Sequence, residues 1–162
     1  MEELRGERLA IVPAAPENAG RLRELRTHPA VARWWDPPPG EWPLSDEPGL
    51  QVFAILVEGE PAGALQFWEE PDPGSRHADV DIFLGPDHQG RGLGTEAMGL
   101  IVRHLVEDRG HHRVTLSTAV DNARAIHVYE KVGFRTVGVT RKASWSELRG
   151  EWQDELLMEY VI

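Results

Sequence analysis

Cysteine is absent from this 162-residue chain, which excludes disulfide bonds, zinc–thiolate sites and a cysteine nucleophile. No apolar run approaches the roughly 20 residues that a membrane-spanning helix needs. The amino terminus, MEELRGERLA, is too charged and has too few apolar residues for a secretory signal. The sequence therefore predicts a cytoplasmic protein with no membrane association.

Positive charge is scarce, because 17 Lys and Arg residues face 27 Asp and Glu residues, a net charge of −10. This balance argues against a nucleic-acid or anionic-membrane partner. It has two interpretations, a surface that only keeps the protein in solution or a cationic partner. The length indicates one domain over residues 1–162, large enough to bury roughly 70% of the surface of the unfolded chain. No apolar stripe exceeds what the core needs, so the sequence indicates no particular oligomeric state.

Apolar periodicity predicts strands and helices that alternate along the chain. Strands are expected around 9–13 and at 52–57, 62–69, 79–84, 114–118, 134–141 and 156–162. Helices are expected at 17–28, 31–35, 98–106 and 121–132. Pro29 ends the first helix, and Gly110 and Gly133 end the last two. This order predicts an α/β or α+β fold with a mixed sheet covered by helices.

A glycine-rich turn lies between the strand at 79–84 and the helix that follows it. Gly90, Gly92 and Gly94 let the backbone approach a ligand closely, and the free N–H groups of the helix start suit a phosphate. Arg91 would add a formal positive charge. The turn is not a P-loop, because it has no lysine, and it is not a dinucleotide fingerprint, because Thr95 replaces the third glycine. A tight strand-to-helix connection is the alternative interpretation.

Two motifs resemble one family. The pattern Gln-x-x-Gly-x-Gly at Gln89, Gly92 and Gly94 resembles the pyrophosphate-binding motif of the GNAT superfamily, the acetyl-coenzyme A-dependent N-acetyltransferases. The segment from Asn122 to Phe134 resembles the second GNAT signature, Asn-x-x-Ala-x-x-x-Tyr-x-x-x-Gly-Phe. The resemblance covers nearly the whole chain. It implies the GNAT fold, in which helices flank a central, mostly antiparallel twisted sheet, and acetyl-coenzyme A as cosubstrate.

The resemblance also implies cofactor-binding residues, position by position. The backbone of the strand at Ile82, Phe83 and Leu84 would pair with the pantetheine arm, as a free strand edge allows. Asn122 would hydrogen-bond that arm, and Ala125 would leave room for it. The residues implied to hold the pyrophosphate are Gln89, Gly90, Arg91, Gly92, Leu93, Gly94 and Thr95.

Acetyl transfer needs a proton donor and a proton acceptor. Attack by an amine expels a thiolate, and the phenol of Tyr129, which the resemblance places near the sulfur, can protonate it. Packing is the alternative role for this tyrosine. The attacking amine must be neutral, and Asp81 is the candidate base because it lies on the cofactor-presenting strand. Asp79 shares its face, so repulsion between the two carboxylates would raise the pKa of at least one of them. The two negative charges together would also attract a cation. Exposure of both aspartates to solvent is the alternative.

A narrower resemblance concerns the substrate. Val31-Ala-Arg-Trp-Trp35 and Asp79-Val-Asp-Ile-Phe-Leu-Gly85 resemble segments of aminoglycoside 6'-N-acetyltransferases. This implies a cationic aminoglycoside acceptor, antibiotic resistance as the consequence, and an acceptor cleft lined by Asp79 and Asp81, with either Trp34 or Trp35 as a wall. Several such enzymes carry Asp-Pro where this chain has Ser117-Thr118. The missing acidic contact would then come from Asp154 or Glu155.

Other functions stay open. The acceptor could instead be a protein N-terminus or another small amine, because peptide acetyltransferases share the same signatures. A coenzyme A-binding module without turnover is a further alternative, against which Asp81 and Tyr129 argue. No metal is expected: His111 and His112 would point to opposite faces of a strand, and His77-x-Asp79 has no evident third ligand.

Overall fold

The computed structural model describes residues 3–162, in which one sheet of eight strands runs through the molecule in the order β1-β2-β3-β4-β5-β6-β8-β7. All neighbouring strands are antiparallel except the parallel pair β5 and β6. The strands are β1 (Leu4–Arg5), β2 (Ala10–Pro13), β3 (Leu50–Val57), β4 (Glu60–Glu69), β5 (Ala78–Leu84), β6 (Arg113–Ala119), β7 (Arg135–Ser146) and β8 (Glu151–Val161). The predicted mixed, mostly antiparallel sheet is confirmed.

Four α-helices join these strands. They are α1 (Pro16–Thr27), α2 (Pro29–Ala32), α3 (Leu93–Arg103), which continues as a π-helical turn over His104–Asp108, and α4 (Ala123–Val132). The termini of α4 follow its sequence: the side chain of Asn122 caps the start, and Gly133 ends it with a φ of 119°. None of the helices in residues 3–162 is both long and apolar enough to cross a membrane.

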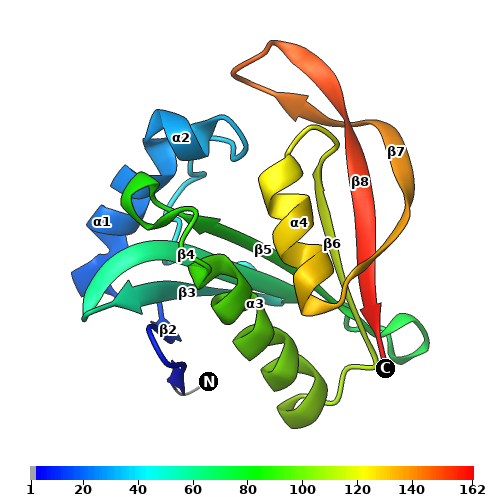
Figure 1. The fold of residues 1–162 in the computed structure, drawn as a ribbon, viewed down its shortest axis with the longest axis horizontal. Helices are drawn as coiled ribbons and strands as arrows, with labels where there is room; N and C mark the ends of the chain where they lie inside the picture. Colours follow the sequence, from blue (N-terminus) through cyan, green and yellow to red (C-terminus); the bar gives the residue numbers. More distant parts are fainter. Residues whose placement is uncertain (1–2) are drawn as a thin grey trace.

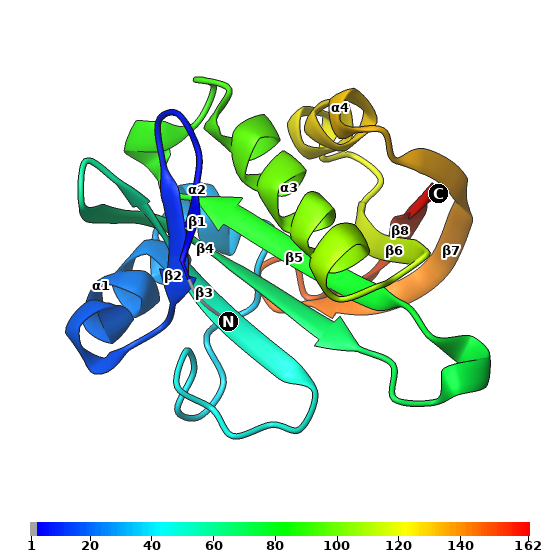
Figure 2. The ribbon, with the colours of Figure 1, turned by 90° about the horizontal axis from the view of Figure 1, so that it is seen from below.

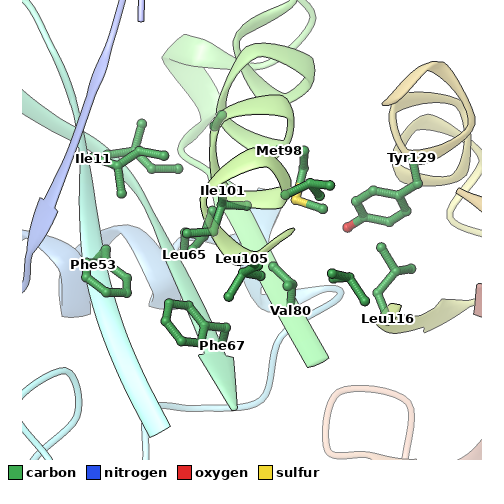
Figure 3. Packing of buried hydrophobic residues seen from close by; sticks show 14 of the residues in the cluster. Ile11, Phe53, Leu65, Phe67, Val80, Met98, Ile101, Leu105, Leu116 and Tyr129 are labelled. Carbon is green, nitrogen blue, oxygen red and sulfur yellow. The ribbon is translucent and has the colours of Figure 1, made fainter. Parts of the chain in front are cut away.

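Helices cover both faces of the sheet (Figure 2), and a separate apolar cluster fills each side; Figure 3 shows residues of the larger one. The larger cluster lies under α3 and α4 and includes Val80 of β5. The smaller cluster lies under α1 and α2 and includes Phe83. Each fully buried aliphatic or aromatic side chain contributes about 1.5–3 kcal/mol to folding. Because side chains alternate along a strand, Asp79, Asp81 and Phe83 share the α1 side, as predicted.

The carboxy-terminal hairpin differs from the prediction. The β7 strand runs to Ser146 and β8 begins at Glu151, so both are longer than the expected 134–141 and 156–162. Val137 and Val139 are 50% and 55% exposed, and the far end of the hairpin extends past the rest of the sheet in Figure 1. A strand that is exposed on both faces has no alternating pattern, so sequence periodicity underestimates its length. The two-residue β1 is too short for any such pattern.

A split opens between β5 and β6. The two strands pair only at Ala78 with Val114 and at Asp79 with Thr115, and they run apart beyond these residues (Figure 1). Within residues 3–162, β5 has no ladder partner on the β6 side after Asp79. The fold therefore leaves a strand edge free inside the sheet, where the sequence placed its candidate catalytic residue, Asp81.

Candidate active site

The free edge of β5 follows its last pair with β6 and contains the residues predicted to pair with the cofactor arm. After this pair, the β5 main chain has no ladder partner on the side of the split within residues 3–162. The carbonyl oxygen of Leu84 already accepts a hydrogen bond from Nε2 of Gln89 at 2.9 Å. The Phe83 carbonyl faces Gly63 of β4, so it is the main-chain groups of Ile82 and Leu84 that face the split. An extended ligand could therefore pair with β5 there, where the Leu84 carbonyl keeps a second lone pair.

The glycine-rich turn ends beside this edge and presents the N-terminus of α3. Gly92 is the N-cap residue, with a φ of 77°, a left-handed conformation that favours glycine. As a glycine it has no side chain to cap the helix, and the first helical hydrogen bond runs from the Glu96 N–H to the Gly92 carbonyl at 3.2 Å. The N–H groups of Leu93, Gly94 and Thr95 are thus left for a ligand at the positive end of the helix dipole. This arrangement fits the pyrophosphate of coenzyme A.

Arginines surround this turn. Arg91 is exposed and donates to the Asp87 carbonyl at 3.4 Å. Arg124, in the first turn of α4, donates from Nη1 to Oε1 of Gln89 at 2.8 Å. Gln89 thus joins the end of β5 to the start of α4, so its side chain has a structural role in addition to its place in the motif. Arg124 sits within the second signature, and sequence reasoning did not single it out.

The glycine-rich turn is also held in place by Arg8, which lies in the turn between β1 and β2. The backbone N–H of Arg8 donates to Oε2 of Glu96 at 2.9 Å, and its Nε donates to Oε1 at 3.0 Å. Its Nη1 donates to the Arg91 carbonyl at 2.6 Å. Arg8 therefore neutralises an acidic side chain in the first turn of α3 and fixes the turn that precedes it. Nothing in the local sequence around residue 8 indicated this contact.

Tyr129 extends from α4 toward Met98 and Leu116 in the larger apolar cluster (Figure 3). It packs edge-on against Phe134 with 6.2 Å between ring centroids. Its hydroxyl makes no hydrogen bond to residues 3–162, and burial, with a further contribution from the Asp81 carboxylate, raises the pKa of the phenol. Tyr129 is therefore neutral at pH 7 and keeps its phenolic proton, and its packing does not conflict with the predicted role.

Asn122 and Ala125 occupy the start of the same helix. Oδ1 of Asn122 accepts the Ala125 N–H at 3.4 Å, so the side-chain oxygen is used as the helix cap. Ala125 is partly buried against the larger cluster. The predicted contact of Asn122 with the cofactor arm is left to its amide nitrogen.

Asp81 lies just beyond the last β5–β6 pair and is partly buried. Burial, together with the neighbouring Asp79 carboxylate, raises the pKa of Asp81 to about 6. Nε2 of Gln66 on β4 lies 3.5 Å from Oδ2 of Asp81, and Oε1 of Gln66 accepts a 2.9 Å hydrogen bond from Nε1 of Trp42. A carboxylate with such a pKa is mostly ionised at pH 7 and can still take a proton readily, which suits a general base.

The acidic residues around Asp81 have distinct positions. Asp79 accepts a 2.7 Å hydrogen bond from the Thr115 hydroxyl, and burial raises its pKa, so it does not face open solvent. Glu155 pairs with Ala119 on the same face and raises the pKa of both aspartates. Asp154 points to the opposite face, where Oδ1 accepts the Lys142 N–H at 2.8 Å. The structure therefore brings Glu155 to the site and takes Asp154 away from it, which corrects the expectation for Asp154.

Residues 19–134 match the sequence profile described as Acetyltransferase (GNAT) family. The chain belongs to this family. The match spans α1 to α4 and contains the free β5 edge, the glycine-rich turn, Asp81 and Tyr129.

Two relatives of this GNAT protein come from Escherichia coli (strain K12). Spermidine N(1)-acetyltransferase is 28% identical over 135 residues, which cover 78% of this chain and 72% of the relative. The L-amino acid N-acetyltransferase AaaT is 28% identical over 135 residues, which cover 83% of this chain and 78% of that relative. Neither name supports the narrower resemblance to aminoglycoside enzymes.

The fold of this GNAT protein is also that of a solved structure. The ribosomal L7/L12 alpha-N-protein acetyltransferase RimL, solved in complex with coenzyme A, superposes with a TM-score of 0.84. The match covers 99% of this chain and 98% of that one, at 18% identity. At this identity the likeness establishes the shared fold.

A groove in this GNAT protein lies between the α1–α2 region and the β7–β8 hairpin, with Trp34 and Trp35 in its wall. Trp35 packs edge-on against Phe83, with ring centroids 4.9 Å apart. Trp34 lies under the guanidinium groups of Arg33, at 4.7 Å, and Arg149 of the hairpin loop, at 5.8 Å. Trp35 thus has the packing role, while Trp34 faces the hairpin. Within residues 3–162, no three His, Asp or Glu side chains gather as a metal site, and the absence of a metal stays a prediction.

Proposed function

We propose that this protein transfers the acetyl group of acetyl-coenzyme A to the amine of a small molecule. The observation that carries the proposal is the β5–β6 split, which leaves the β5 edge free beside Asp81. The Asp81 carboxylate contributes to the raised pKa of Tyr129, which supports a base and an acid in one site. The uncapped N-terminus of α3 supplies an anion site beside it.

The two side chains divide the proton transfers. Coenzyme A presents the acetyl group as a thioester. An acceptor that arrives as an ammonium first releases one proton to solvent, and Asp81 then accepts the proton that the neutral amine loses as the N–C bond forms. Tyr129 donates its proton to the sulfur as the C–S bond breaks, and the proton on Asp81 returns to the phenolate through solvent. The products are an amide and a free thiol, and both residues end in their starting states.

The relatives support a small amine as the acceptor. Spermidine and L-amino acids, which the two relatives from E. coli acetylate by name, represent the two chemical classes to test first. A protein N-terminus is supported by the shared fold with RimL. An aminoglycoside, acetylated at its 6'-amine, is supported only by the sequence resemblance and by the acidic side chains of Asp79, Asp81 and Glu155.

A thiol-release assay with acetyl-coenzyme A tests the proposal. The acceptor panel contains spermidine, free amino acids, a peptide with a free N-terminus, and aminoglycosides with either a 6'-amine or a 6'-hydroxyl. We expect turnover on a small amine. Turnover on the peptide alone would instead identify an N-terminal acetyltransferase. Coenzyme A binding with no turnover on any acceptor would leave a binding module.

Asp81→Asn separates chemistry from cofactor binding. The variant is expected to lose roughly 100-fold or more in kcat, because it lacks the base, while its affinity for coenzyme A stays unchanged. In the unmodified protein, kcat/KM is expected to fall about tenfold per pH unit below pH 6, as the Asp81 carboxylate becomes protonated. Asp46→Asn, an exposed loop substitution, is the matched control and keeps this pH profile. Normal turnover by Asp81→Asn at pH 7 would assign the base elsewhere.

A further inference from the structure

Arg26, near the end of α1, is a buried cation with no ion pair in residues 3–162. Its side chain lies between two aromatic rings, with the guanidinium carbon 4.9 Å from the Trp35 centroid and 4.6 Å from the Trp42 centroid. The residue is only 7% exposed. Its Nε donates to the Asp36 carbonyl at 2.8 Å, and Nη1 and Nη2 have no protein acceptor in that range. Neither nitrogen is fully enclosed, so both donors can reach a ligand in the groove that Arg26 lines.

Burial of the Arg26 guanidinium disfavours its charged form. Burial lowers the pKa of Arg26 to about 10, against the opposing effect of the carboxylates of Asp36 and Asp81. The guanidinium still carries its charge at pH 7. Two parallel N–H donors on a rigid planar group match the two oxygens of a carboxylate. An anionic ligand would therefore add to the partial compensation that the carboxylates of Asp36 and Asp81 provide.

The position of Arg26 connects it to the groove and to the base. Arg26 lines the groove beside Trp34 and Trp35. Trp42, on which its guanidinium stacks, also donates to Gln66, and Gln66 is the hydrogen-bond partner of Asp81. One continuous set of contacts thus runs from the cation to the base. Asp79 and Glu155 add negative charge beside Asp81, while Asp36 and Glu147 line the groove on the Arg26 side together with Arg33.

We propose that the acceptor is an amine that also carries a carboxylate, as an amino acid does, and that Arg26 binds this carboxylate while Asp81 receives the amine. The proposal rests on the proposed function, and it narrows the acceptor to one of its classes. An ammonium group is attracted to the Asp79, Asp81 and Glu155 side, and a carboxylate to Arg26. Spermidine and aminoglycosides have no carboxylate, so they would bring further positive charge toward a buried cation.

The first test compares acceptors that differ only in the carboxylate. The twenty common L-amino acids are screened with acetyl-coenzyme A, and the best of them is compared with its carboxamide, its decarboxylated amine and spermidine. We expect kcat/KM for the amino acid to exceed each of these by at least about tenfold, mainly through KM, because a charge-assisted bidentate contact is lost. A carboxamide or spermidine that reacts as well as the amino acid would overturn the inference.

The second test removes the cation. In Arg26→Met, which keeps a long apolar side chain between the tryptophans, the ratio of kcat/KM for the amino acid and its carboxamide is expected to fall toward one. Arg23→Met is the matched control, because Arg23 lies one turn earlier on α1 and holds the same loop through the carbonyls of Gly40 and Trp42. A loosened loop would affect the amino acid and its carboxamide equally. The ratio of their kcat/KM values is therefore expected to stay unchanged in Arg23→Met. An unchanged ratio in Arg26→Met would contradict the inference.

Unchanged coenzyme A affinity, measured by calorimetry, shows that each variant is folded. If Arg26→Met does not fold, Arg26→Lys retains the charge without the planar fork, and its ratio is expected to fall below that of the unmodified protein while staying above one. The two proposals fail in different ways. Absence of turnover on every amine would overturn the proposed function, whereas rapid turnover confined to amines without a carboxylate would overturn only the assignment of Arg26.

Discussion

The two halves of the candidate site are built from different parts of the chain. The cofactor half uses main-chain groups, namely the free edge of β5 and the N–H groups at the start of α3, and most of it comes from residues 82–95. The acceptor half uses side chains from five elements or loops, including Arg26 of α1, Gln66 of β4, Asp81 of β5 and Glu155 of β8.

This difference has consequences for both binding and stability. A site made of peptide groups depends on backbone conformation, and it binds one cosubstrate whatever the acceptor. A site made of buried charges can change its specificity through single substitutions, but each unpaired charge costs stability. We therefore expect substitutions in the acceptor half to stabilise the empty protein while they remove function, and substitutions in the cofactor half to act mainly on coenzyme A binding.

The largest expected effect is on stability and concerns Asp81→Asn. The native pKa of about 6 lies above the value of about 4 in an unfolded chain. Between these values the native state binds more protons, so the stability of the unmodified protein falls as pH rises through this window. The variant is expected to be more stable by up to about 3 kcal/mol at pH 8, with this gain absent at pH 4.

Urea unfolding at both pH values measures this difference. Asp46→Asn, exposed and far less constrained, should show no such pH-dependent gain. A variant of Asp81 that is less stable than the unmodified protein at pH 8 would show that the acceptor half does not carry an uncompensated charge.

An intermediate effect is expected for Gly92→Asp in the cofactor half. The substitution places a carboxylate at the N-terminus of α3, against the pyrophosphate, and coenzyme A affinity should fall at least about tenfold, or 1.4 kcal/mol. Gly59→Asp in the β3–β4 turn is the control, since its φ of 80° nearly equals that of Gly92 and imposes a similar backbone strain. Calorimetry should show normal affinity for the control. Equal losses in both variants would indicate strain rather than a lost anion site.

The smallest effect is expected for Glu96→Gln, which weakens the contact with Arg8 that braces the same turn. The pair is partly exposed on the Arg8 side, so we expect a loss of less than about 1 kcal/mol in stability and of about twofold to threefold in coenzyme A affinity. Glu24→Gln, which breaks the exposed pair with Arg21, should leave coenzyme A affinity unchanged. A tenfold loss in Glu96→Gln would show that side chains, and not only backbone groups, determine binding in the cofactor half.

Sequence patterns predicted the cofactor half better than the acceptor half. Asn122 caps the start of α4, as predicted, because capping depends on a few neighbouring residues. The helix after the glycine-rich turn was also predicted, although α3 begins at Leu93 and not at 98. Alternation also placed Asp81 on the correct face of its strand. The choice between Asp154 and Glu155 could not be made in this way, because it depends on the register between β8 and β6, two strands that are far apart in the chain.

The sequence by itself determined the helices, most strands, the glycine-rich turn and the family signatures, since each depends on local periodicity, capping or a short motif. Only the tertiary structure decided that β5 and β6 separate after Asp79, that Arg8 braces the turn before α3, and that Arg26 lies between Trp35 and Trp42. These features arise from contacts between residues distant in the chain. The burial that raises the pKa of Asp81 and leaves Arg26 without an ion pair exists only after the two faces of the sheet are covered.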